Sequence, residues 1–130
     1  MRESWSQVVS RLEQRKRDWA TLESVGSVLE VARFVSEGPL ATGLFGSVSL
    51  GGLLLAQTEA SFEYPHYGPH LRVAPEDRGL VSFTYVDTHD KALQWRRVVN
   101  GSDAIHRLLR FLDEMRWFPR ETLMSFGIAW

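Results

Sequence analysis

The sequence contains no cysteine. Disulfide bonds, thiolate catalysis, zinc–thiolate sites and iron–sulfur clusters held by cysteine are therefore excluded. The chain also lacks a long apolar run. The longest, residues 50–56, is interrupted by glycines and is much shorter than the ~20 residues of a membrane-spanning helix. No apolar signal-peptide region follows Met1, so we expect a cytoplasmic protein that does not enter a membrane.

Motifs for catalysis are also missing. The chain has no Gly-x-Ser-x-Gly nucleophile motif and no glycine-rich loop ending in Gly-Lys-Ser/Thr. The glycines between residues 43 and 52 are better interpreted as strand irregularities and a turn. Two pairs of adjacent carboxylates, Glu76/Asp77 and Asp113/Glu114, are interpreted as solvated charges. We therefore lean toward a protein that is not an enzyme, with no catalytic residue, no metal site and no cofactor.

The composition is that of one globular domain. The 130 residues are 44% hydrophobic and 24% charged, and the formal net charge is −1. No repeat or low-complexity segment divides the chain, so we predict a single α+β domain over residues 1–130. The near-neutral charge hides an uneven distribution, because the two ends are basic and residues 21–90 are acidic. This pattern argues against a generally basic nucleic-acid binder. It indicates a surface with both positively and negatively charged regions, which suits a protein partner.

Apolar residues at helical spacing predict three helices. Residues 5–19 form the first, with Ser4 and Gln7 at the spacing of a capping box. Residues 22–36 form the second, which Gly38 and Pro39 end. A third helix begins after Ser102 as N-cap and runs to about residue 115.

Alternating and glycine-rich segments between the helices predict strands. Residues 42–50 and 53–58 form a hairpin with its turn at Gly51-Gly52, and residues 61–64 are a further extended candidate. Residues 80–87 and 92–99 form a second hairpin. The expected fold is α+β, with two N-terminal helices, a mostly antiparallel four- to five-stranded sheet and a C-terminal helix on one sheet face. The other face is either open or covered by the N-terminal helices. Residues 120–130 add an edge strand or dock on a partner.

A loop at residues 62–70 gathers aromatic and imidazole side chains between prolines and glycines, which is typical of a binding loop. Its ligand-binding candidates are Tyr64, His66, Tyr67 and His70. Glu63 could complete a metal site with the two histidines, but the prolines prevent the regular helix that such spacing needs, so no metal site is predicted. His89 beside Asp90 resembles a general base with its carboxylate, yet an exposed turn explains the pair better.

The C-terminal part supplies the interface candidates. Trp residues are frequent in interface hot spots, and Arg makes planar contacts with carboxylates. The candidates are Trp117, Phe118, Trp130, Arg116 and Arg120. Trp5, Trp19 and Trp95 are expected in the core instead.

We therefore expect a non-enzymatic protein–protein interaction module of a bacterial type, such as an adaptor, a secretion chaperone or an immunity-like protein, with a protein partner or a second copy of itself. The alternative is a small-ligand-binding domain or minor enzyme that uses the loop at residues 64–70. A third hypothesis is weak nucleic-acid binding through Arg and Trp side chains, which we consider less suited to this charge.

Overall fold

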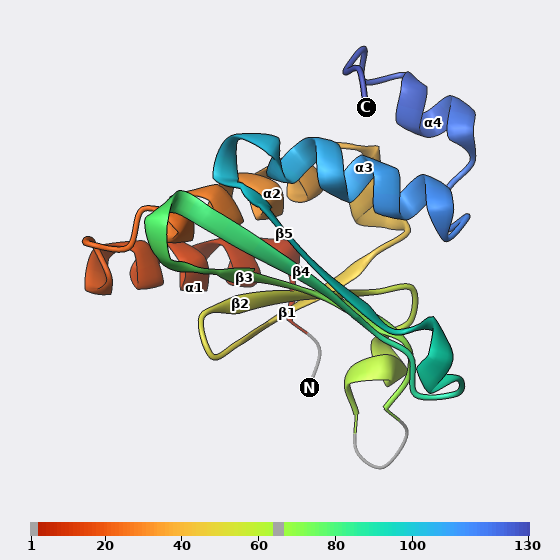
Figure 1. Cartoon of the computed structure of the whole chain (residues 1–130), viewed down its shortest axis with the longest axis horizontal. Helices are drawn as coiled ribbons and strands as arrows, with labels where there is room; N and C mark the ends of the chain where they lie inside the picture. Colours follow the sequence, from red (N-terminus) through yellow and green to blue (C-terminus); the bar gives the residue numbers. More distant parts are fainter. Residues whose placement is uncertain (1–2, 64–66) are drawn as a thin grey trace.

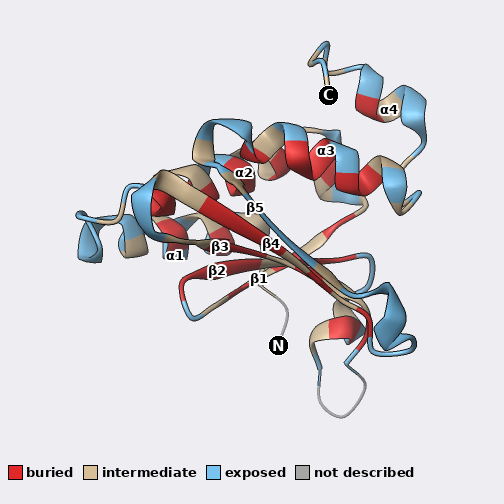
Figure 2. Cartoon of the chain, in the orientation of Figure 1, coloured by how far each residue is buried: buried red, intermediate tan, exposed pale blue. Residues whose placement is uncertain are grey.

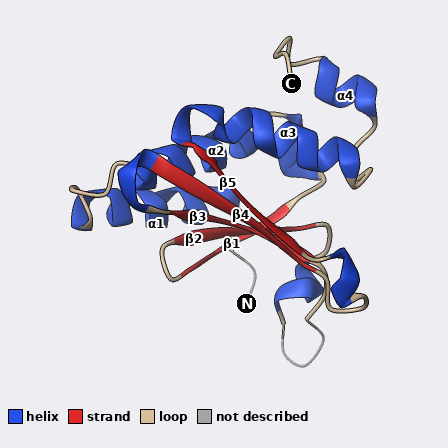
Figure 3. Cartoon of the chain, in the orientation of Figure 1, coloured by secondary structure: helices blue, strands red, loops and turns tan. Residues whose placement is uncertain are grey.

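The computed structural model describes residues 3–63 and 67–130. The chain begins with two helices, continues through a five-stranded sheet and ends with two further helices (Figures 1 and 3). These elements are α1 (Trp5–Asp18), α2 (Ser24–Ser36), β1 (Phe45–Ser49), β2 (Gly52–Ala56), β3 (His70–Pro75), β4 (Leu80–Val86), β5 (Trp95–Asn100), α3 (Ala104–Glu114) and α4 (Arg120–Met124). The α+β class predicted from the sequence is confirmed.

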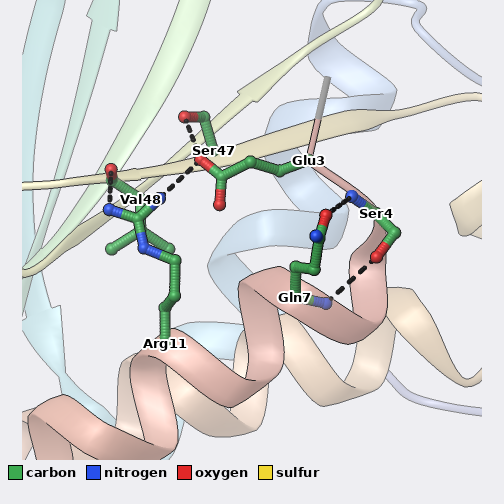
Figure 4. Close-up of polar contacts among 6 residues, drawn as sticks. All are labelled: Glu3, Ser4, Gln7, Arg11, Ser47 and Val48. Atoms are coloured by element: carbon green, nitrogen blue, oxygen red, sulfur yellow. Dashed lines mark hydrogen bonds and ion pairs between the residues drawn. The ribbon is translucent and has the colours of Figure 1, made fainter. Parts of the chain in front are cut away.

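Local signals at the helix ends explain where α1 and α3 begin. The Ser4 hydroxyl accepts a hydrogen bond from the Gln7 backbone N–H at 3.1 Å, and the Gln7 side chain accepts one from the Ser4 N–H at 2.8 Å (Figure 4). The predicted capping box is thus confirmed. The N-cap of α3 is Asp103 and not Ser102, because residues Gly101–Asp103 first form a single 3₁₀ turn.

The five strands form an antiparallel meander in the order β1-β2-β3-β4-β5. Ser49 pairs with Gly52, so the two turn residues of the first hairpin are Leu50 and Gly51. The prediction of a Gly51-Gly52 turn was wrong by one residue. Both turn residues have positive φ, 51° for Leu50 and 78° for Gly51, as a mirror-image hairpin turn requires. This register places Val48 opposite Leu53 on the buried face of the sheet.

Residues 61–63 and β3 differ from the prediction, while residue 64 of the predicted strand lies outside the described residues. Ser61 and Phe62 belong to a short 3₁₀ helix (Glu59–Phe62), not to a strand. The strand β3 was not predicted at all, because only two of its residues, Leu71 and Val73, are large, apolar and buried. It nevertheless occupies the centre of the sheet and pairs with both β2 and β4.

All three long helices pack on the same face of the sheet. Helix α1 packs against β1, α2 crosses β2, β3 and β4, and α3 contacts α2 and β5 (Figure 1). The buried residues of the core belong mainly to these helices and to the strands (Figure 2). On the opposite face, one row of neighbouring residues crosses all five strands: Ser47, Leu54, Arg72, Thr84 and Arg96. Within the described chain, no α-helix covers that face, which answers the question that the sequence left open.

Residues 120–130 form the short helix α4 and a tail, with no edge strand. Phe126 packs on Phe34 with ring centroids 4.8 Å apart, and Ile128 and Trp130 also pack against the core. The tail therefore covers the chain's own helices. Among the described residues, no helix combines the length and the apolar character needed to cross a membrane.

Candidate functional site

The two edge strands of the sheet, β1 and β5, differ in the hydrogen bonds that other parts of the chain make to them. Two side chains of α1 bond to β1 and to the residue before it. The Trp5 indole donates to the Leu44 carbonyl at 3.1 Å. Figure 4 shows the second bond, from Arg11 to the Val48 carbonyl at 3.3 Å. Strand β5 lies at the other end of the sheet and pairs only with β4. In the part of the chain that the structure describes, no hydrogen bond reaches the outer side of β5. It is the free edge.

Basic and aromatic side chains surround this free edge. Arg96 and Arg97 are exposed on β5, and their side chains lie on opposite faces because they are adjacent in a strand. Arg96 forms an ion pair with Glu76 at 3.2 Å on the open face. The guanidinium groups of Arg97 and of Arg107 from α3 each lie 5.4 Å from the Trp95 ring centroid, within the range of a cation–π contact.

An open pocket of about 510 Å³ lies between β5, α3 and the C-terminal tail. Its lining residues are Val99, Asp103, His106, Arg107, Arg110, Ala129 and Trp130. Arg107 is only 6% exposed and donates through Nη2 to Glu114 at 2.8 Å. Arg110 donates through Nε to the Trp130 carbonyl at 2.8 Å, which holds the tail against α3.

Two buried donors at this pocket have no hydrogen-bond partner among the described residues. They are the Arg107 Nε and the Trp130 Nε1. His106 was not predicted as part of a site. The available signal was the spacing of residues 103, 106, 107 and 110, which places them on one side of a helix.

The predicted interface residues lie beside this pocket, around the end of α3 and the start of α4. Trp117 packs edge-on against Phe111, with ring centroids 4.9 Å apart, and Phe118 lies over Gly43. Both aromatic side chains are partly buried against the chain's own core. With Pro119 and charged neighbours, they line a second pocket of about 740 Å³.

The two arginines of that group remain exposed. Arg116 lies two residues after the end of α3 and has a positive φ of 56°. Arg120 makes two hydrogen bonds to Asp113, at 3.2 and 2.9 Å, and these hold the pKa of the Asp113 carboxyl below its ordinary value. The Arg120 guanidinium also lies 5.9 Å from the Trp130 ring centroid. Arg120 therefore links α3, α4 and the tail, and Trp130 lines the pocket beside β5.

The ligand-binding candidates of the aromatic loop are only partly placed. Tyr64 and His66 lie outside the described residues. His70 begins β3, and its Nδ1 lies 3.0 Å from the Gly68 carbonyl oxygen. Tyr67 is half exposed and lines an open pocket of about 550 Å³, to which His89 from the β4–β5 connection also belongs. The structure thus brings two of the segments that the sequence had singled out to one pocket.

Asp87 stabilises the β4–β5 connection through hydrogen bonds to its carboxylate. Its carboxylate accepts hydrogen bonds from the backbone N–H groups of Asp90 at 2.8 Å and His89 at 2.9 Å, and from the Tyr85 hydroxyl at 2.8 Å. The Asp90 N–H, followed by the Tyr85 hydroxyl, lowers the pKa of Asp87. Burial, together with the bond to Asp87, raises the pKa of Tyr85. The carboxylate therefore holds the turn by its backbone.

This arrangement predicts an acid-sensitive contribution to stability. The pKa of Asp87 is lower in the folded chain than the ordinary value of 3.8, so the unfolded chain takes up the proton more readily and acid favours unfolding. The stability advantage of the native protein over an Asp87→Asn variant should be complete above pH 3.8. It should then disappear as the pH falls through the folded pKa.

Urea unfolding of both proteins from neutral pH downward measures this difference. Asp77→Asn, at the exposed turn before β4, is the control for simple loss of a charge. A gap between native protein and Asp87→Asn that stays constant at every pH would contradict the assignment.

No group of three or more metal-ligating side chains occurs in the described ranges. What the geometry supports instead is a free sheet edge beside a basic pocket, and separately a pocket at Tyr67 and His89. Comparison with known proteins adds no relative: no family model matches the chain, and no match is found among the curated proteins or the solved structures.

Proposed function

We propose that this protein is a non-enzymatic protein–protein interaction module, of the kind found in bacterial adaptors, secretion chaperones and immunity proteins, and that it acts in the cytoplasm. The free edge of β5 carries the proposal. An extended segment of a partner can add to such an edge, with backbone hydrogen bonds giving affinity and neighbouring side chains giving specificity.

The charges at β5 favour a different, acidic protein over a second copy of this chain. If two copies of β5 paired with each other in an antiparallel manner, the adjacent Arg96 and Arg97 of each copy would lie close to those of the other. Like charges that face each other across strands are destabilising, and charged residues on edges are a common protection against such self-pairing. A segment that alternates apolar and acidic residues places all its carboxylates on one face of the added strand, where they would meet Arg97 on the helix side or Arg96 on the open side.

The test uses labelled extended peptides as probes. A fluorescent peptide of alternating Val and Glu should bind, and the double variant Arg96→Glu/Arg97→Glu should weaken its binding at least tenfold. The double variant changes the arginine on both faces, so whichever face the carboxylates occupy, a charge-assisted contact is lost and a repulsive one is introduced. Fluorescence anisotropy measures the affinity.

The matched control is Lys16→Glu/Arg17→Glu, which makes the same charge change at two exposed residues of α1, beside the opposite edge of the sheet. This control should bind the peptide nearly as the native protein does. Equal binding by all three proteins, or equal binding of a Val-Lys peptide, would contradict docking at β5.

A second candidate function rests on the pocket that Tyr67 and His89 share. Its lining also includes the polar side chains of Gln57, Thr58 and Ser61, so a small polar ligand could be held there. Binding at this pocket would change the ring signals of His89 in NMR spectra and leave the β5 amides unchanged, which separates it from partner docking.

A further inference from the structure

The pocket between β5 and α3 combines positive charge with unused hydrogen-bond donors. Arg107, Arg110 and His106 line one side of it, and Trp130 lines the other. Asp103 is the acidic residue in the lining. The lining residues therefore carry two fixed positive charges and one negative, Glu114 outside the lining pairs with Arg107, and Val99 of β5 belongs to the same lining.

The unpaired donors are the feature that needs an explanation. Nearly all buried polar groups in folded proteins have a hydrogen-bond partner, because an unsatisfied buried donor is costly. Here Arg107 Nε and Trp130 Nε1 are both buried and unpaired, and both belong to side chains that line the same pocket. Arg107 keeps its Nη2 on Glu114, so its Nε remains available to a further acceptor.

We propose that this pocket binds a carboxylate of the acidic segment that docks on β5. The inference rests on the proposed function for the origin of that carboxylate. A carboxylate has two acceptor oxygens and a negative charge, which match two N–H donors, one of them on a guanidinium. Arg110 supplies further positive charge, and His106 a further polar group. The carboxylate is either an Asp or Glu side chain or the carboxyl terminus of the partner.

Binding of the carboxylate requires a shift of the Trp130 side chain. Neither unpaired nitrogen is exposed to water, so an anion reaches them only after one side chain shifts. The tail at Trp130 is held by the hydrogen bond from Arg110 and the contact with Arg120, both exposed side chains, and Trp130 is only partly buried where it packs against the core. Arg107, in contrast, is anchored by Glu114 and by the Trp95 ring.

NMR of the side-chain N–H groups tests the site directly. Three hexapeptides serve as probes: alternating Val and Glu with both ends blocked, alternating Val and Gln with both ends blocked, and the Val-Gln peptide with a free carboxyl terminus. The Val-Glu peptide should shift the Arg107 Nε–H and Trp130 Nε1–H signals downfield in a saturable manner, and the blocked Val-Gln peptide should not. A response to the free-ended Val-Gln peptide instead would support the site and assign it to a carboxyl terminus.

Two substitutions test whether the peptide's carboxylate binds at this pocket. Arg110→Gln should weaken the apparent affinity about tenfold, since one charge-assisted contact is lost. The control Arg17→Gln, on α1, should leave it unchanged. The carboxylate site would be overturned if neither carboxylate-bearing peptide shifted either side-chain signal. An equal shift with the blocked Val-Gln peptide would overturn it as well.

The same spectra separate this inference from the proposed function. Strand addition is read from the backbone amides of β5, and carboxylate binding from the two side-chain signals. If only the β5 amides respond, the carboxylate site is wrong and partner docking stands. If only the side-chain signals respond, the carboxylate site stands and strand addition at β5 is wrong.

Discussion

A Phe111→Ala variant is expected to lose about 3–5 kcal/mol of unfolding free energy, the usual cost of removing a fully buried aromatic ring. Phe111 is completely buried in α3. Its ring centroid lies 5.6 Å from that of Tyr85, 5.7 Å from that of Trp95 and 4.9 Å from that of Trp117. Because domains of this size are stable by only about 5–15 kcal/mol, this loss would be a large part of the total.

Urea unfolding followed by circular dichroism measures this loss. Phe111→Leu should lose less, because it leaves a smaller cavity. Met124→Ala is a control for removing an apolar side chain from the surface, since Met124 is 59% exposed, and it should change stability little. Equal stability of Phe111→Ala and Met124→Ala would show that the aromatic cluster does not hold α3 on the sheet.

The same ring also supports the proposed docking surface. Phe111 packs against Trp95, and Trp95 in turn carries the guanidinium groups of Arg97 and Arg107. We therefore expect the fraction of Phe111→Ala that remains folded to bind the Val-Glu peptide more weakly. The effect would arise from a loosened edge and not from a lost contact, which Phe111 is too buried to make.

Where the sequence carries strong local signals, it predicts the structure well. The capping box at Ser4, the apolar stripes of the helices and the alternation in β4 each depend on residues a few positions apart. Strand β3 was not predicted because Pro69 precedes it, Pro75 ends it and Arg72 separates its two large buried residues, so the local pattern is short. Its identity as a central strand comes from pairing with β2 and β4, which is information that no local window contains.

The candidate site shows the same limit. That residues 95–100 are a strand is predictable, but that they form the free edge depends on the order of all five strands. Arg107 and Trp130 line the same pocket because the tail folds back over α3. Trp117 and Phe118 were expected at an interface, yet they pack partly on their own chain. Phe118 finds its place over Gly43, where the absence of a side chain leaves room for its ring.

Gly46, like Gly43, lies against an aromatic ring. A glycine inside a strand indicates a close approach of another group. The structure identifies that group as the Trp5 ring: a Cβ atom at Gly46 would lie 2.6 Å from the Trp5 ring carbon Cη2. Trp5 also donates its indole N–H to the Leu44 carbonyl at 3.1 Å, so one side chain both packs on β1 and bonds to the chain that enters it.

A Gly46→Val variant is therefore expected to lose about 1–3 kcal/mol of unfolding free energy, as is usual for an overpacked core. The Trp5 ring would have to move away from its position over residue 46, and α1 would lose its close packing on β1. Gly26→Ala is the matched control. A Cβ there meets only the end of the Lys16 side chain at 3.6 Å, and alanine is the better helix former, so this change should be neutral or stabilising.

A double-mutant cycle decides whether Trp5 is the cause. Trp5→Leu alone should also destabilise the protein, because it leaves space over Gly46. If the valine side chain fills that space, the double variant Trp5→Leu/Gly46→Val should be more stable than the sum of the two single losses requires. Additive losses would mean that the two residues do not compete for the same volume. In that case, the cost at Gly46 would lie in the strand backbone and not in the packing of α1 on the sheet.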